Sequence, residues 1–353
     1  MKILYVETQS SGHHQKYYNC LLKHFKAEKL IGVFPSGTNF DETIKYHLDN
    51  ESHGVAIIKY IKWLRAVYKI ANKEKPDIIH FLYADYFYRY FGSFLKILRK
   101  YHTVATFHHV KRSRFRDISI KHICKNINDC VVHTESLKHD LMQLGIKNIN
   151  QIEYPVFFEQ DNKGVLPDSV DLPDKIDFKI LSALGSTRYD KGLDILLESL
   201  KNLEEKFLLI IAGSEAYFTR EQINNMIETY SDKVILYLQY LTDDELIAFI
   251  RLSDIIVLPY RKMFDGASGP LAEGVFWGKR IVGPSHGSLG NIINENDLGI
   301  TFESENTDSL KKAIKEALKI PAGYSSKYLN YQDRLSQESF SAAYAEIYYK
   351  KGV

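Results

Sequence analysis

Cysteine and long apolar runs are both scarce in this chain of 353 residues. The three cysteines, Cys20, Cys124 and Cys130, are an odd number and too few to staple a chain of this length, so we expect reduced thiols. No run of about eighteen uncharged apolar residues occurs, which argues against a membrane-spanning helix. The first apolar stretch, Ile3 to Val6, is too short for a signal-peptide core. These absences predict a cytoplasmic protein unless a partner carries it elsewhere.

Several nucleotide-binding signatures are missing as well. No G-x-G-x-x-G follows the first predicted strand, which argues against a dinucleotide-binding enzyme. The stretch GPLAEG, which begins at Gly269, continues with Val275 and Phe276 rather than Lys and Ser, so it is not a P-loop. Zinc-finger spacing, an RNP motif and a long basic helix are absent too, so we expect no nucleic-acid partner.

The composition that remains is that of an ordinary globular protein with a large core. Apolar residues make up 45%, charged residues 25% and aromatic residues 13%. The length favours two domains of about 100–200 residues each. The net charge of +2 hides an asymmetry, because residues 1–165 carry 25 Lys and Arg against 16 Asp and Glu, whereas the rest carries 21 against 28. A basic half joined to an acidic half predicts two domains that attract each other, or a basic half that faces an anionic surface.

Short β-branched or aromatic runs alternate with segments of helical periodicity, the pattern of an α/β protein with parallel sheets. A stretch rich in Asp, Asn, Gly, Pro and Ser predicts a linker at residues 161–177. It separates an N-terminal Rossmann-like domain at 1–160 from a C-terminal one at 178–335, and a terminal helix within 336–353 can pack back on the first domain. Ligands of doubly wound sheets bind beyond the carboxyl ends of the strands, so we expect a site in a central cleft between the two domains.

The segment from Tyr260 to Gly283 carries the most chemistry. A glycine-rich loop leads into a predicted helix, with Ser268 placed as its cap and Pro270 in the first turn. The amide groups of such a helix start can receive an anion, and a diphosphate is the natural candidate. Asp265 in the loop and Glu273 in the helix are eight positions apart, so they can reach different parts of one extended ligand. The expected contacts of the first turn are Gly269, Pro270 and Leu271.

Two cations follow the first strand of the acidic domain. Arg188 and Lys191 stand three residues apart in a short loop ahead of a predicted helix, within ALGSTRYDKGLDILLESL. Cations at this place can neutralise a leaving diphosphate as charge develops on it.

Both segments resemble motifs of the retaining glycosyltransferases of the GT-B fold, of the glycosyltransferase family 4 type. The spacing of Asp265 and Glu273 is similar to the E-x7-E motif of that family, and Arg188 with Lys191 is similar to its Arg and Lys-Gly pair. In that family the second acid grips the ribose hydroxyls of a nucleotide sugar, and the first contacts the sugar. The resemblance therefore implies these roles for Glu273 and Asp265, although aspartate in place of glutamate shortens the reach by one methylene group.

The resemblance covers residues 178–320 well and the first domain mainly by layout. It implies a nucleotide diphosphate sugar of the UDP or GDP type as co-substrate, with no cofactor. The segment GPSHGSLGNIIN is similar to the family's loop near the base and phosphates, which implies that His286 lines the donor pocket, although Asn291 stands where glutamate is common. No Asp-x-Asp follows a strand, and Cys130 and His133 fall on opposite faces of one predicted strand, so we expect no metal.

Two loops of the basic domain match the family more loosely. Gly12 follows the first strand and suits the approach of donor phosphate or acceptor, but it is equally an ordinary connection. His108, at the end of the strand TVATF, is similar to a histidine that the family often places near the reacting sugar, although a strand-end histidine can be a plain core residue. The segment from His109 to Lys125 interleaves basic and apolar residues, so it is either a solvated loop or a surface for anionic lipid or a phosphate-bearing acceptor.

The prediction that results is a metal-independent glycosyltransferase. It would move a sugar from a nucleotide diphosphate sugar to a hydroxyl of a glycan or lipid-linked acceptor, with retention of anomeric configuration, in the cytoplasm or peripherally at the inner face of the membrane. The residues expected to serve catalysis are His108, Arg188, Lys191 and Asp265. Two alternatives stay open: a GT-B nucleotide-sugar epimerase, and a catalytically degenerate GT-B protein that binds a donor or a partner chain.

Overall fold

The computed structural model describes residues 1–9, 13–24, 29–38, 42–49, 55–108, 113–173, 178–264 and 268–350. The chain divides into two compact units, one of Met1–Phe157 with Gln337–Val353 and one of Phe158–Ser336. Among the helices of the described ranges, none combines the length and the apolar character that crossing a bilayer requires.

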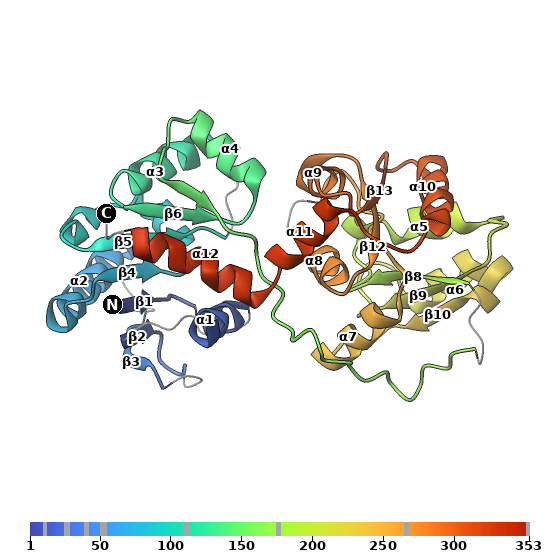
Figure 1. Cartoon of the computed structure of the whole chain (residues 1–353), viewed down its shortest axis with the longest axis horizontal. Helices are drawn as coiled ribbons and strands as arrows, with labels where there is room; N and C mark the ends of the chain where they lie inside the picture. The colour runs from blue at the N-terminus through green and yellow to red at the C-terminus, as the bar shows by residue number, and fades with distance from the viewer. Residues whose placement is uncertain are drawn as a thin grey trace. The chain divides into compact units, whose positions relative to one another are not determined.

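The first unit is built on a parallel sheet (Figure 1). In the described part of the chain its strand order is β3-β2-β1-β4-β5-β6-β7, so the order reverses between β1 and β4. The strands are β1 Lys2–Val6, β2 Lys29–Phe34, β3 Ile44–His47, β4 Ile78–Phe81, β5 His102–Thr106, β6 Asp129–Val132 and β7 Ile149–Gln151. The helices are α1 His13–His24, α2 Ala56–Glu74, η1 Ala84–Tyr90, η2 Leu95–Leu98, α3 Arg114–Cys124, α4 Glu135–Gln143 and α12 Gln337–Tyr349.

The central strands of this sheet are buried along their length because helices cover both faces. One apolar cluster packs the sheet against α2, η1 and α3, and a second packs it against α1 and α12. The doubly wound fold that the alternating pattern predicts is therefore confirmed for this unit.

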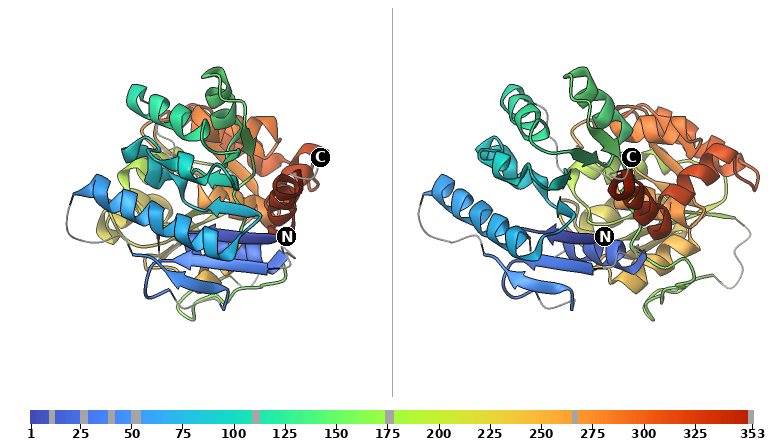
Figure 2. Two further views of the ribbon diagram at one scale, coloured as in Figure 1. Left: turned by 90° about the vertical axis from the view of Figure 1, so that its left-hand side faces the viewer. Right: turned by 60° about the vertical axis from the view of Figure 1, so that its left-hand side comes forward.

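The terminal helix α12 packs beside β1 and α1 in both sets of views (Figures 1 and 2). The Tyr344 hydroxyl lies 2.5 Å from the Tyr17 hydroxyl and 2.7 Å from Thr106 Oγ1. The Tyr348 hydroxyl lies 2.6 Å from Nδ1 of His80, a fully buried side chain of β4. Burial lowers the pKa of His80 to about 3, so the imidazole is neutral and can join this network without carrying charge into the core.

The helical periodicity from Tyr86 to Arg99 predicts a single helix, and this prediction is wrong. The structure forms two short 3-10 helices there, because Phe91, Gly92 and Phe94 have left-handed φ angles of 51°, 58° and 66°. A Cβ at Gly92 would come within 2.8 Å of the Ile123 side chain on α3, so close packing as well as the φ angle requires glycine. Periodicity alone gives no sign of this break.

The second unit is also built on a parallel sheet. Across the described residues its order is β10-β9-β8-β11-β12-β13, and the order reverses between β8 and β11. The strands are β8 Lys179–Leu184, β9 Phe207–Ala212, β10 Val234–Tyr237, β11 Ile255–Val257, β12 Arg280–Pro284 and β13 Gly299–Phe302. The helices are η3 Tyr189–Lys191, α5 Leu193–Leu200, α6 Arg220–Ile227, η4 Glu228–Lys233, α7 Asp243–Leu252, α8 Gly269–Phe276, α9 Gly287–Glu295, α10 Thr307–Lys319 and α11 Ser326–Arg334.

The segment that leads into this unit is held against α7 rather than extended away from it. The Val165 amide donates to the Asp244 carbonyl at 3.1 Å, and the Gly164 amide donates to Asn162 Oδ1 at 2.9 Å. The structure thus groups residues from Phe158 onward with the second unit, whereas the sequence placed the linker at 161–177.

Candidate functional site

Most of the candidate residues lie at the carboxyl edge of the second sheet. The η3 turn with Arg188 and Lys191 follows β8, α8 follows β11, and His286 follows β12. Because β8 and β11 flank the reversal of strand order, their loops diverge and leave room for a ligand between them. A cavity of about 20 Å³ marks this place, and its lining includes Lys191 and Tyr260.

Lys191 is a half-buried cation at this edge. Its Nζ lies 3.4 Å from the Leu184 carbonyl oxygen and 5.9 Å from the centroid of the Tyr260 ring. Burial, followed by the nearby Arg188 cation, lowers the pKa of Lys191, and Asp190 and Glu273 offset part of that shift. Lys191 is therefore a cation with few anionic groups around it. Such a cation favours the binding of an anionic ligand.

The space for this lysine depends on a glycine. Gly185, at the end of β8, has a φ of +100°, and a Cβ placed on it would collide with Lys191 Nζ. Any side chain at this position would displace the ammonium group as well as strain the backbone.

Arg188 is paired within its own turn. Its Nε and Nη2 donate to the two carboxylate oxygens of Asp190 at 2.9 and 2.6 Å. This pairing raises the pKa of Arg188 and lowers that of Asp190. The Arg188 side chain is 52% exposed, and exposed ion pairs contribute only about 0–1 kcal/mol, so an incoming anion can take the place of Asp190.

Arg261 fixes the shape of the turn that carries both cations, a role that the sequence did not reveal. Its Nη2 donates to both carboxylate oxygens of Asp194 at 2.8 and 2.6 Å, and its Nε donates to the Tyr189 carbonyl at 2.9 Å. The guanidinium also lies 4.0 Å from the centroid of the Tyr189 ring. No local pattern signals this contact, because Arg261 and Asp194 are 67 positions apart.

The start of α8 differs in detail from the expectation. The Ser268 hydroxyl caps the helix by accepting from the Leu271 amide at 3.3 Å, and Pro270 has no amide hydrogen. Of residues 269–271, only Gly269 is left to offer its amide to an anion. A Cβ on Gly269 would lie 3.5 Å from Glu273 Oε1, so the Glu273 carboxylate folds back over the first turn of its own helix.

His286 is oriented by two residues that the sequence did not single out. Ser304 Oγ donates to the Tyr260 carbonyl at 3.1 Å and lies 2.8 Å from His286 Nδ1. A hydroxyl has one hydrogen to donate, so His286 Nδ1 must be the donor to Ser304, which leaves Nε2 for a ligand. The Tyr260 hydroxyl lies 3.2 Å from Ser268 Oγ, and burial raises the pKa of Tyr260 to about 12.

Asp265 and Gly12 lie outside the described residues. The structure therefore brings together Arg188, Lys191, Glu273 and the first turn of α8, and it adds His286 on the neighbouring loop.

His108 stands on the first unit, at the carboxyl edge of that sheet, directly after β5. Its Nε2 donates to the Leu82 carbonyl at 2.8 Å, and its backbone amide donates to Asp85 Oδ2 at 2.8 Å. The rings of Tyr17 and His133 each lie 5.0 Å from its ring centroid. His108 is thus the centre of a histidine and aromatic cluster rather than an isolated side chain.

A buried acid joins this cluster at the end of β1, another feature that the sequence did not reveal. Glu7 Oε1 accepts from the amides of Thr8 and Gln9 at 2.6 and 3.0 Å, and its Oε2 lies 3.3 Å from His14 Nδ1. The His14 ring in turn lies 5.5 Å from that of His108. Among the side chains that the structure describes, no three His, Cys, Asp or Glu converge as metal ligands would.

Comparisons with known proteins identify the fold and the family. Residues 170–338 match the family model of glycosyl transferases group 1, and residues 2–134 match that of glycosyl transferase 4-like proteins. An uncharacterized glycosyltransferase of Methanocaldococcus jannaschii is 27% identical over 135 residues, which are 38% of this chain and 37% of that relative. The chain thus matches little more than a third of the length of that curated relative.

Solved structures match the chain over nearly its whole length. The lipopolysaccharide outer core galactosyltransferase WaaB is 13% identical with a TM-score of 0.73, over 99% of this chain and all of that one. The Anabaena protein HepE, solved with UDP, is 12% identical with a TM-score of 0.71, over 98% and 99% of the two chains. A glycosyltransferase of Rickettsia africae is 19% identical with a TM-score of 0.68, over 99% and 98%.

These likenesses confirm the GT-B fold class, and the two family models account for both units. The chain therefore belongs to the GT-B glycosyltransferases of the group 1, family 4-like type.

Proposed function

We propose that this chain transfers a sugar from a nucleotide diphosphate sugar, of the UDP or GDP type, to a hydroxyl of a glycan or lipid-linked acceptor, with retention and with neither metal nor cofactor. The observation that carries the proposal is the half-buried Lys191 beside Arg188 and α8, where burial lowers the lysine pKa. A cation in such a place is stabilised when a diphosphate arrives. HepE, which shares the fold, is solved with UDP and with UDP-glucose.

The residues at this edge suit the departure of a nucleoside diphosphate. Arg188 and Lys191 would stabilise the phosphate oxygen as its bond to the sugar carbon breaks, and the Gly269 amide would add a neutral donor. Glu273 would hold the ribose hydroxyls, and Asp265 would hold the sugar. The acceptor oxygen would bond to the same carbon on the same face, while its proton passes to the departing phosphate.

The remaining candidate residues surround these groups. His286 would present Nε2 near the phosphates or base, beside the first turn of Gly269, Pro270 and Leu271. On the first unit, His108 would lie near the reacting sugar, and Gly12 would allow donor phosphate or acceptor to approach. We place the reaction in the cytoplasm, and the exposed basic and apolar residues of α3 support peripheral contact with an anionic membrane.

Thermal unfolding of the purified chain with UDP, GDP, ADP, CMP and their sugars tests the donor assignment. A ligand that binds only the folded form at 100 times its Kd adds about 2.7 kcal/mol, so the matching nucleotide raises the Tm clearly. The Glu273→Ala variant should lose both this shift and sugar transfer, whereas Glu295→Ala, at the exposed far end of α9, should keep both.

Three results would contradict the proposal. They are the absence of any Tm rise with every nucleotide, wild-type transfer by Glu273→Ala, and binding of a donor without hydrolysis or transfer, as a degenerate protein would show. Conversion of a nucleotide sugar into its epimer with no acceptor present would indicate the epimerase instead. Retention is checked on the product, by the coupling constant of its anomeric proton.

A further inference from the structure

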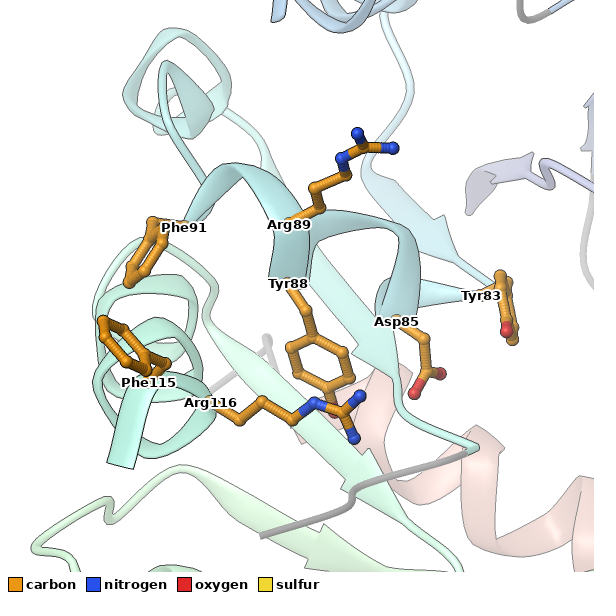
Figure 3. A pocket seen from close by; sticks show the side chains of 7 residues that line it. All are labelled: Tyr83, Asp85, Tyr88, Arg89, Phe91, Phe115 and Arg116. Atoms are coloured by element: carbon orange, nitrogen blue, oxygen red, sulfur yellow. The ribbon is translucent and has the colours of Figure 1, made fainter. Parts of the chain in front are cut away.

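A hollow of about 580 Å³ lies in the first unit between η1 and α3 (Figure 3). Aromatic and charged side chains line it. They are Tyr83, Asp85, Tyr88, Phe91, Phe115 and Arg116, with Arg89 on the rim.

The two ends of the hollow differ in chemistry. Figure 3 shows the rings of Phe91 and Phe115 next to each other at one end, and the Arg116 guanidinium beside the ring of Tyr88 at the other. Phe115 is 76% exposed, although it is a large apolar side chain, and Phe91 is 39% exposed. One end therefore offers flat apolar surfaces, and the other offers a planar cation suited to a carboxylate or phosphate.

A buried polar atom at this site has no partner. The Tyr88 hydroxyl is buried and makes no hydrogen bond with any described group, while its ring stacks on Phe107 at 5.6 Å. Burial raises the pKa of Tyr88 well above its usual value, so the hydroxyl keeps its proton. Buried polar groups are normally satisfied, and this hydroxyl can be satisfied by an oxygen of a ligand in the hollow.

Two further observations connect the hollow to function. Phe91 has a φ of 51°, a strained conformation for a bulky residue that tends to occur at functional sites. Asp85 accepts the backbone amide of His108 at 2.8 Å, and the Tyr83 ring lies 5.7 Å from that of His108. Two residues of the lining, Asp85 and Tyr83, therefore adjoin His108 of the histidine cluster.

We propose that this hollow binds an acidic saccharide, the anionic part of the acceptor, with its carboxylate or phosphate on Arg116 and the Tyr88 hydroxyl and its sugar ring against Phe91 and Phe115. The proposal rests on the proposed function, because it names the class of acceptor. The anionic group can belong to a free saccharide or to a lipid-linked one, and the experiment separates these sources.

Saturation-transfer NMR on the full chain tests the proposal, with methyl glucuronide and uncharged methyl glucoside as probes. We expect magnetisation to pass from the protein to the glucuronide, which shows binding, and little to pass to the glucoside. Arg116→Gln should weaken glucuronide binding about tenfold, and Tyr88→Phe, which removes one hydroxyl from a folded site, should weaken it several-fold. Lys121→Gln removes the same charge from the exposed far end of α3, so it should bind like the wild type.

Further arms separate this site from the donor site and from a membrane surface. Lys191→Met should bind glucuronide normally, because Lys191 is not among the residues that line the hollow, so a failed donor assignment leaves this result standing. Phe115→Ala should weaken glucuronide binding, and Ile118→Ala, which changes another exposed apolar side chain on α3, should not.

Vesicles of phosphatidylglycerol and of phosphatidylcholine complete the test. Capture by the anionic vesicles that fails in Arg116→Gln, but not in Lys121→Gln, would assign the anion to a lipid-linked source. The proposal is overturned if glucuronide shows no transfer, if Arg116→Gln and Lys121→Gln behave alike, or if only vesicles bind and Ile118→Ala abolishes that binding as much as Phe115→Ala.

Discussion

The two units share one sheet topology and carry different chemistry at the same edge. In each, the strand order reverses beside the first strand, so the loops after that strand and its neighbour diverge. In the second unit these loops hold two cations, a helix start and an acid. In the first unit, His14 and a buried glutamate lie after β1, and His108 and His133 follow β5 and β6 at the same edge. Topology thus determines where a ligand can bind, and the side chains determine which one.

The units also differ in the surroundings of a buried basic side chain. In the second unit, burial and the neighbouring Arg188 cation lower the pKa of Lys191, and nearby acids offset only part of this shift. His80 of the first unit is neutral and bonded on both ring nitrogens, to Tyr348 and Thr106. We interpret the first arrangement as a binding device and the second as a structural one.

Lys191→Met should have the largest effect. Loss of a preorganised charge contact raises a barrier by about 2.7–4 kcal/mol, so turnover should fall about 10²–10³-fold. The free protein should be at least as stable as the wild type, since a folded-state pKa below the unfolded one means that the charged lysine disfavours folding at neutral pH. Steady-state rates and the Tm with and without nucleotide measure both effects. A large drop in the Tm of the free protein would show that Lys191 is structural instead.

Acid should weaken the first unit through His80. Its pKa is about 3 in the folded protein against about 6.5 when unfolded, so the unfolded state binds more protons between these values. The contribution of neutral His80 to the free energy of unfolding is complete above pH 6.5. It decreases by about 1.4 kcal/mol for each pH unit as the pH falls from 6.5 towards 3. Denaturant unfolding at pH 7 and pH 5 should show a smaller decrease for His80→Gln than for the wild type. Equal decreases would contradict the assignment.

Arg261→Gln should loosen the turn that carries Arg188 and Lys191. It removes the paired bonds to Asp194, and charge-assisted bonds of this kind contribute about 1.5–3 kcal/mol. We expect a lower Tm and a higher KM for the donor, with kcat less affected. The matched control is Lys201→Gln, whose exposed pair with Glu198 should contribute about 0–1 kcal/mol. If both variants behave alike, Arg261 does not shape the site.

Asp190→Asn should have the smallest effect. Unlike Arg261→Gln, it should not weaken nucleotide binding. It frees the exposed Arg188 from its carboxylate, at a cost of about 0–1 kcal/mol in stability. Nucleotide should then bind as tightly or more tightly, because the anion no longer competes with Asp190. Titration of the nucleotide by calorimetry checks this, and clearly weaker binding would show that Asp190 itself contacts the ligand.

Much of the layout was predictable because it depends on short-range patterns. Alternating apolar runs predicted the two doubly wound units, and the loops of Arg188 with Lys191 and of Gly269 with Glu273 were visible within single segments. The roles of these residues stay predictions.

Local periodicity did not predict the break between Tyr86 and Arg99, since the left-handed conformations there depend on packing against α3. The sequence also did not predict the partners of Arg261, or the hydrogen bonds that connect His286 to Ser304 and Ser304 to Tyr260. Those residues are far apart in sequence. The hollow beside Tyr88 was missed for the same reason.

Apolar periodicity and strand-end chemistry are local properties, so the amino-acid order alone predicts the class of fold, the division into two units and the types of side chain that follow each strand. Packing between distant segments sets how exposed each charge is, which partner orients it and where the aromatic rings lie together. Burial and long-range hydrogen bonds set the pKa values of Lys191 and His80, and both arise only when distant segments pack together.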